Sequence, residues 1–264
     1  MRMSFGRLIA AAVVSLVALN ASAQAAEPHK IAVENGPHAE IAELVKKIVA
    51  KDGIDLQIVE ISDYARFNPA LNDGDVDANA FQHKPYLDQQ IADRGYKLTA
   101  VAPIVVFPIG VYAKSIKSLD QLPVGGKIAI PNDPSNGGRA LLLLQSKGLI
   151  KIKSGTGLTP TVADITDNPK KIKITEIDAA QVAHFLPDVD AAIINTNYAI
   201  QGKLDPAKDA IARESAESPY VNVLVVRTAD VDKAWVKALV AAYHSDEVRA
   251  YITAKYAGVV VPGF

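Results

Sequence analysis

The stretch IAIPNDPSNGGRALLLLQSKG, residues 128–148, decides the fold because it contains a strand, a turn and a helix in succession. The apolar run IAI is typical of a buried strand, and the leucine-rich segment predicts a helix from Gly137 to Lys147 that ends at Gly148. Arg139 then stands near the helix start, where unpaired N–H groups already carry partial positive charge. Either an anion meets Arg139 there, or its side chain extends into solvent.

The alternation of strands and helices continues on both sides of this stretch. Towards the N-terminus, the sequence predicts strands at 30–35 and 55–61 around a helix that ends at Gly53, two helices separated by a polar turn within 68–95, and a β-rich run at 97–113. Towards the C-terminus, it predicts a strand at 171–178, a short helix at 179–185, a strand and helix within 189–202, a β-run at 218–230 and two helices within 231–256. This order indicates an α/β fold with mostly parallel strands and helices on both faces.

The chain crosses between two units of similar size at the β-runs near 104–113 and 220–227. We therefore expect one lobe at 27–110 plus 226–264 and a second lobe at 111–225, with a cleft between them. Ligands of open α/β sheets bind beyond the carboxyl ends of strands, so Arg139 is expected at the cleft, which favours the anion over the solvent alternative.

The composition excludes several classes of protein. The 264 residues contain no cysteine, which rules out disulfides, thiolate metal sites, a cysteine nucleophile and an acylated cysteine within this sequence. The net charge of −1 and the lack of a basic stripe argue against binding to nucleic acid.

The first 23 residues have the order of a secretory signal peptide. Arg2 and Arg7 precede an apolar run, and small residues follow, so cleavage is expected after Ala23 or Ala25. A retained membrane anchor is the alternative, although the apolar run is short for a bilayer-spanning helix.

Catalytic and metal-binding motifs are missing from the sequence. It has no nucleophile elbow, phosphate-binding loop or zinc-binding histidine pair, and its five histidines are scattered. Asp133 and His83 are the acid–base candidates for an enzyme, and His38 with His83 would be the ligands of a metal-ion receptor. Both alternatives stay open from the residues alone.

Aromatic and amide side chains gather near the expected cleft instead. Tyr64, Phe81 and Tyr86 could pack on an apolar or thioether chain, and His83 beside them is either a packing residue or part of a site. Asparagines at the ends of strands or within them, at 195, 197 and 222, need hydrogen-bond partners. An arginine for a carboxylate, amides for an amine and rings for a side chain describe a receptor for an amino acid.

Long blocks of the sequence identify the family that it resembles. GPHAE, DANAFQHKPYLDQQ, AIPNDPSNGGRALLLLQ, DVDAAIIN and SPYVNVLVVR resemble the NlpA/MetQ-type family of methionine-binding proteins of ABC importers, over essentially the whole chain from Lys30. The resemblance implies a two-lobed periplasmic-binding-protein fold (type II-like), with mixed sheets flanked by helices and a ligand cleft. It also implies a monomer without cofactor that delivers methionine to an inner-membrane permease–ATPase complex and is not an enzyme.

The resemblance assigns roles to seven residues. Arg139 would hold the methionine carboxylate, Asn195 and Asn222 would bind its amino and carboxylate groups, and the side-chain pocket would be formed by Tyr64, Phe81, His83 and Tyr86. Family members are commonly lipoproteins acylated on a cysteine, and this sequence has none, so we expect a periplasmic protein without a lipid anchor. Another small amino acid or a short methionine-containing peptide is the alternative ligand.

Overall fold

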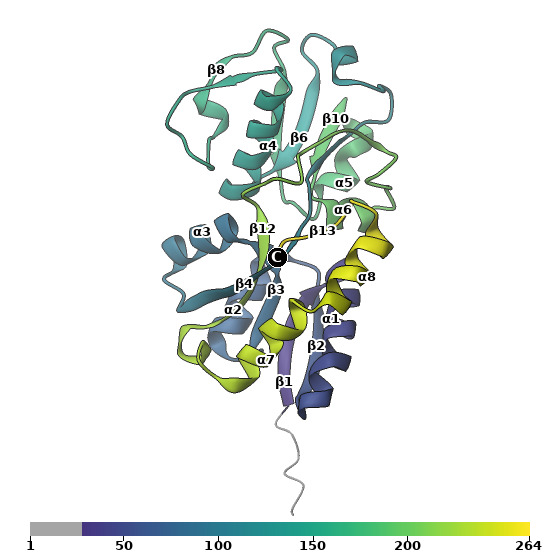
Figure 1. Ribbon diagram of the computed structural model, residues 1–264. Coiled ribbons are helices and arrows are strands. Elements are labelled where there is room, and N and C mark those ends of the chain that lie inside the picture. The colour runs from purple at the N-terminus through teal and green to yellow at the C-terminus, as the bar shows by residue number, and fades with distance from the viewer. Residues whose placement is uncertain (1–27) are drawn as a thin grey trace, which may run out of the picture.

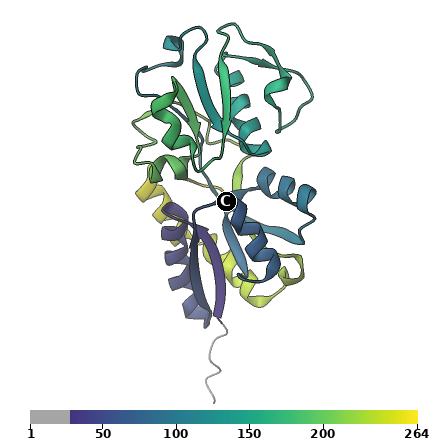
Figure 2. The same ribbon diagram turned by 180° about the vertical axis from the view of Figure 1, so that it is seen from behind.

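The computed structural model describes residues 28–264, which form two lobes stacked end to end (Figures 1 and 2). The expected signal peptide and its cleavage positions lie outside the described residues. From residue 28 onward, no helix is both long and apolar enough to cross a membrane. The α/β fold with mixed sheets flanked by helices is confirmed.

The first lobe, at the bottom of Figure 1, is built on a six-stranded sheet with the strand order β13-β4-β12-β3-β1-β2. β1 pairs parallel with β2 and β3, whereas β12 pairs antiparallel with β3 and β4, so this sheet is not mostly parallel. Its strands are β1 (Pro28–Glu34), β2 (Asp55–Ile61), β3 (Ala78–His83), β4 (Leu98–Val106), β12 (Val221–Arg227) and β13 (Val261–Pro262). Its helices are α1 (Pro37–Val49), α2 (Tyr64–Asp73), α3 (Lys84–Arg94), α7 (Ala234–Tyr243) and α8 (Asp246–Tyr256), with short 3-10 turns η1 (Ala50–Asp52) and η5 (Thr228–Asp230).

The second lobe contains a five-stranded sheet in the order β11-β5-β10-β6-β9 and a separate β7-β8 pair. Its strands are β5 (Gly110–Tyr112), β6 (Lys127–Pro131), β7 (Lys151–Ile152), β8 (Ile165–Asp167), β9 (Lys173–Ile177), β10 (Ala191–Ile194) and β11 (Ala210–Arg213). Its helices are α4 (Pro134–Ser146), α5 (Val182–Phe185) and α6 (Thr196–Gln201), with 3-10 turns η2 (Leu119–Gln121), η3 (Val162–Asp164) and η4 (Leu186–Asp188).

Two crossing segments connect the lobes. Residues 107–109 lead from β4 to β5, and residues 214–220 lead from β11 to β12. β5 and β12 each lie in a single sheet, so the lobe boundaries expected after residues 110 and 225 fall inside these strands. The backbone N–H of Glu214 donates to the carbonyl of Ile109 at 3.0 Å, which ties the two crossing segments together.

The central strand β3 was not predicted from the sequence: it directly follows the predicted polar turn at 72–78, where only a second helix was expected. All six of its residues are buried, and two of them are amides. Gln82 and Asn79 bond to Asn68 of α2, with Gln82 Nε2 donating to Asn68 Oδ1 at 2.7 Å and Asn79 Nδ2 to the same oxygen at 3.1 Å. Because these buried amides satisfy one another, the strand needs no continuous apolar run, and the usual sequence signal is absent.

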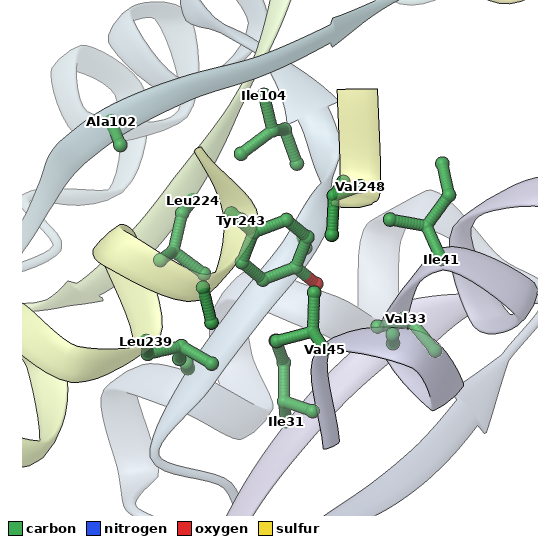
Figure 3. Packing of buried hydrophobic residues seen from close by; sticks show 14 of the residues in the cluster. Ile31, Val33, Ile41, Val45, Ala102, Ile104, Leu224, Leu239, Tyr243 and Val248 are labelled. Carbon is green, nitrogen blue, oxygen red and sulfur yellow. The ribbon is translucent and has the colours of Figure 1, made fainter. Parts of the chain in front are cut away.

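Helices cover both faces of the first lobe's sheet. On one face, the ring of Tyr243 fills the space between strands and helices, surrounded by side chains labelled in Figure 3 that include Ile31, Val33, Val45 and Leu239. Leu239 and Tyr243 of α7 are buried in this cluster. The other face carries α2 and α3. A second apolar cluster lies there, and it includes the rings of Phe67, Phe81 and Tyr86.

Candidate functional site

A small pocket lies between the lobes, at the crossing segments. It is lined by Tyr64, Phe81, Gln82, His83, Tyr86, Phe107, Asn136, Arg139, Asn195, Thr196, Asn197 and Asn222. All seven residues selected from the sequence therefore meet in one place, although they come from five elements and the junction of β10 and α6, spread over more than half of the chain. Five further lining residues, among them Asn136 and Phe107, were not selected.

The helix that carries Arg139 begins earlier than the sequence predicted. Asp133 is the N-cap of α4 and accepts the backbone N–H of Asn136 at 2.9 Å, while Pro134 occupies the first turn. Arg139 is the sixth residue of the helix and not its first, so the premise that it opposes the helix dipole at the N-terminus is wrong. Gly138 is required by packing, because a Cβ there would lie 2.6 Å from the carbonyl oxygen of Leu158.

Arg139 is 3% exposed, so the solvent alternative is wrong too. An anion does meet it, but that anion belongs to the chain: Nη2 contacts the Glu214 carboxylate at 2.5 Å and Nε lies 3.2 Å from both carboxylate oxygens. Nη2 also donates to the carbonyl of Phe107 at 2.8 Å, and the guanidinium lies over the ring of Tyr220 at 4.5 Å. Nη1 makes no hydrogen bond within residues 28–264.

Through these contacts the Arg139 side chain binds both crossing segments. Phe107 lies in the first segment, and Glu214 and Tyr220 lie in the second. The guanidinium is thus held by a charge-assisted pair and a carbonyl, both of which fix its plane. One nitrogen remains for a further acceptor.

A relay of amides orients Asn195. Asn136 Nδ2 donates to the Asp133 carboxylate at 3.0 and 3.1 Å, so Asn136 must present its oxygen on the other side. That oxygen accepts Asn195 Nδ2 at 2.8 Å. Asn195 Oδ1 is consequently turned away, and it is buried with no partner among the described residues. A buried carbonyl oxygen without a donor is costly, which marks it as the acceptor for a ligand group.

His83 spans the cleft as a neutral ring. Its Nδ1 accepts the N–H of Tyr86, which caps α3, so the proton must be on Nε2, which lies 3.0 Å from Asn136 Oδ1 in the other lobe. Burial, with the charge of Arg139 as a smaller contribution, lowers the pKa of His83 from 6.5 to about 3. His83 is therefore both a packing residue and a lining residue.

Asn222 is oriented by a second histidine. Its Nδ2 donates to His38 Nε2 and to the carbonyl of Phe81, each at 3.0 Å, which leaves Oδ1 without a donor in the part of the chain that the structure describes. His38 stacks against Phe107 with ring centres 4.7 Å apart, and burial lowers its pKa from 6.5 to about 3. Both histidines are thus used to orient amides.

The part of the pocket lined by rings is its aromatic end, as distinct from the polar end around Arg139 and Asn195. Phe81 stacks on Phe67 with ring centres 3.8 Å apart, and the ring of Tyr64 lies 5.6 Å from that of Phe81 and 6.0 Å from that of Tyr86. Phe81 and Tyr86 belong to the buried apolar cluster of α2, β3 and α3, and Tyr64 packs against it. Their faces and edges offer a surface for an apolar or sulfur-containing chain.

The residues that sequence reasoning missed are mostly polar partners from distant segments. Glu214 lies 75 positions after Arg139, and nothing in ARESAESP distinguishes it from a solvent-exposed acid. Only Asn136 had a signal in the sequence. Asp133 followed by Pro134 is the usual arrangement at a helix N-cap, and it places Asn136 in the first turn of the helix, at the end that faces the cleft.

The structure gives no support to a metal site. No group of three or more metal-ligating side chains occurs among the described residues. His38 and His83 are each engaged with an asparagine, and Asp133 caps a helix, so these groups are committed to hydrogen bonds within the chain.

The fold and pocket define a two-lobed protein whose site presents polar groups at one end and rings at the other. The family model described as NlpA lipoprotein matches residues 30–264, and the chain belongs to this family. D-methionine-binding lipoprotein MetQ of Escherichia coli (strain K12) is 52% identical over 239 residues, covering 89% of this chain and 88% of that protein. A probable D-methionine-binding lipoprotein MetQ of Vibrio cholerae is 48% identical, covering 97% and 96% of the two chains.

Solved structures agree with this assignment. A nutrient binding protein from Burkholderia cenocepacia bound to methionine is 51% identical with a TM-score of 0.87, covering 89% of this chain and all of that one. A periplasmic substrate-binding protein of an ABC transporter from Coxiella burnetii is 44% identical with a TM-score of 0.85, covering 89% of this chain and 99% of that one.

Proposed function

We propose that this protein binds methionine between its lobes as the substrate-binding component of an ABC importer. One observation carries the proposal: at the polar end of the pocket, a donor (Arg139 Nη1) and an acceptor (Asn195 Oδ1) both lack partners in the described chain. A zwitterionic amino acid supplies the complement of both, a carboxylate and an ammonium group. The relatives named for methionine and the structure bound to methionine support the choice of side chain.

The seven residues selected from the sequence take the following roles. Arg139 binds the carboxylate, Asn195 accepts from the ammonium group, and Asn222 offers its free oxygen to the same end of the ligand. The thioether chain lies among Tyr64, Phe81, His83 and Tyr86. Each catalytic candidate is engaged within the chain, which supports binding over catalysis.

Calorimetric titration of purified protein that has been unfolded, dialysed and refolded tests the proposal. We expect methionine to bind with a dissociation constant of about 1 μM or lower, or about −8 kcal/mol. Leucine and alanine, which lack the thioether, should bind more weakly. Mass spectrometry of small molecules released by denaturing the protein as purified should detect methionine. Tight binding of another amino acid or a methionine-containing peptide, with none for methionine, would contradict the proposal.

We further propose that the protein is exported to the periplasm, acts there as a monomer without a lipid anchor, and docks to an inner-membrane permease–ATPase complex. The N-terminal pattern and the lack of a cysteine in the sequence support export without thiol acylation, although the relatives are named lipoproteins. Fractionation of expressing cells tests this part: the protein should appear in the osmotic-shock fluid. Recovery with membranes would contradict it.

A further inference from the structure

Glu34 is a buried acid between the lobes that the proposed binding chemistry does not use. It is the last residue of β1 in the first lobe and is 1% exposed. Its Oε1 accepts hydrogen bonds from Asn197 and, at 3.2 Å, from Gln201 Nε2, both on α6 of the second lobe. Its Oε2 is buried without a partner among the described residues.

The surroundings of Glu34 contain no counter-charge. The ion pairs of residues 28–264 do not include Glu34. The titratable groups that face it are Tyr64 from α2 and Tyr198 from α6, and the charge of Glu34 would raise the pKa of each hydroxyl further. On the neighbouring strand β2 it pairs with the apolar residue Ile61. An ionised carboxylate in this position would be desolvated and unpaired, so burial raises the pKa of Glu34 well above its usual value.

The contacts of Glu34 depend on how the lobes meet. Its hydrogen-bond donors, Asn197 and Gln201, are on the other lobe, so separating the lobes removes both and admits water. Glu34 also fixes a lining residue, because Asn197 donates to it through Nδ2 and must accept the Tyr64 hydroxyl through Oδ1, at 2.8 Å. Tyr64 and Asn197 both line the pocket.

We propose that Glu34 is a positioning residue that joins the closed lobes as a neutral carboxyl group, so that ligand-driven closure takes up one proton from solvent at this side chain. The inference rests on the proposed function, since it requires a ligand that closes the lobes. Opening exposes the carboxyl to water, where it ionises and returns the proton. No bond other than this O–H bond forms or breaks.

Proton uptake fixes the direction of the pH dependence. The closed form has the raised pKa and the open form a pKa near the usual 4.5. Between these two values, binding one ligand takes up one proton, and affinity falls as pH rises, by up to tenfold per pH unit. Below the pKa of the open form, Glu34 is protonated in both forms and this dependence vanishes.

The test compares three proteins by calorimetric titration with methionine from pH 5 to pH 8: wild type, Glu34→Gln and Glu60→Gln. Gln keeps a neutral acceptor for Asn197 and Gln201, whereas Glu60 is an exposed acid on the adjacent strand β2. Titrations at each pH in two buffers of different ionisation enthalpy count the protons taken up. The difference between wild type and Glu34→Gln isolates Glu34 from His38 and His83, which both proteins share.

We expect wild type and Glu60→Gln to take up close to one proton more per methionine than Glu34→Gln. The Gln variant should bind at least tenfold more tightly than wild type at pH 8, and the difference should shrink to about fourfold or less at pH 5. Equal proton uptake and parallel pH profiles in wild type and Glu34→Gln would overturn the inference. So would loss of binding in folded Glu34→Gln at every pH, because the negative charge would then be needed.

A carbon-13 NMR titration separates this inference from the proposed function. The carboxyl signal of Glu34, assigned by its loss in Glu34→Gln, should titrate well above the other glutamates in protein closed on whichever amino acid binds it. If methionine fails to bind at any pH, the proposed function is contradicted, and this titration still decides the state of Glu34. A signal that titrates near pH 4.5 in the closed protein overturns the inference.

Discussion

The two ends of the pocket are built in different ways. At the polar end, each group has an assigned partner: Glu214 and Phe107 hold Arg139, and Asn136 holds Asn195. At the aromatic end, Tyr64, Phe81 and Tyr86 are held by packing on one another and on the layer beneath, and of the three only Tyr64 also bonds through its side chain, to Asn197.

This difference teaches how each end should respond to substitution. A hydrogen-bonded polar group has no substitute, and its loss leaves a charge or a lone pair unmatched in a buried site. A ring shares its contacts with neighbours, so its loss removes a part of the surface only. The polar end should therefore set whether an amino acid binds, and the aromatic end should set which one.

The largest effect is expected from Arg139→Ala. Removing the guanidinium deletes the donor for the ligand carboxylate and leaves Glu214 unpaired, so methionine should bind at least about 30-fold more weakly, or about 2 kcal/mol. Arg227→Ala is the matched control, because Arg227 also pairs with two carboxylates, of Asp77 and Asp230, but does not line the pocket. Calorimetry should show near wild-type affinity for that control. Wild-type affinity in Arg139→Ala would defeat the carboxylate assignment.

A smaller loss, about tenfold, is expected from Asn195→Ala, because it removes one buried acceptor worth about 1–3 kcal/mol. The loss should depend on the ligand's ammonium group. A deamino analogue of methionine should bind wild type weakly and should bind Asn195→Ala no more weakly than that. If the variant loses affinity for both ligands by the same factor, Asn195 does not accept from the ammonium group.

At the aromatic end, Tyr86→Ala should weaken methionine by about twofold to tenfold, in line with roughly 0.3–1.5 kcal/mol for a sulfur–aromatic contact. Binding of alanine, whose side chain does not reach the rings, should change less. Tyr86→Phe is the control, since the Tyr86 hydroxyl has no hydrogen bond within the described chain, and its ligand ranking should match wild type. An unchanged ranking in Tyr86→Ala would exclude this ring from the side-chain pocket.

The smallest effect on methionine binding near neutral pH is expected from His38→Gln. The same substitution should have a clear effect on how stability depends on pH. The folded pKa of His38, about 3, lies below its usual 6.5, so the unfolded state gains a proton first as pH falls. The contribution of His38 to the free energy of unfolding is complete above pH 6.5 and declines by about 1.4 kcal/mol per pH unit below it, until the pH nears 3. Urea unfolding measures the free energy of unfolding at pH 7 and at pH 5. Its decrease between the two should be about 2 kcal/mol smaller in His38→Gln than in wild type. Replacing the exposed His184 by Gln should leave the wild-type loss unchanged, and a wild-type loss in His38→Gln would contradict this origin.

The sequence predicted the parts of the fold that depend on local pattern. β2 lies at Asp55–Ile61 as expected, and Gly53 ends the preceding helical segment in the left-handed conformation. β3 was missed because its buried amides hide the apolar pattern of a central strand. The start of α4 was placed too late because the Asp133 cap and Pro134 were read as part of the turn.

The candidate site divides in the same way. Its seven selected residues could be named from residue types and from the family resemblance, and they do meet in one pocket. Glu214 and Glu34 could not be found, because an acid paired across 75 or 163 positions has no local signature. What orients each selected group, and which atom remains available to a ligand, follows only from the three-dimensional arrangement.

A crystal structure of the protein with methionine at saturating concentration tests the proposed division of the pocket most directly. We predict that the methionine carboxylate lies within hydrogen-bond distance of Arg139 Nη1, its ammonium group near Asn195 Oδ1, and its sulfur among the rings of Tyr64, Phe81 and Tyr86. A methionine bound in the reverse orientation, or outside this pocket, would contradict it.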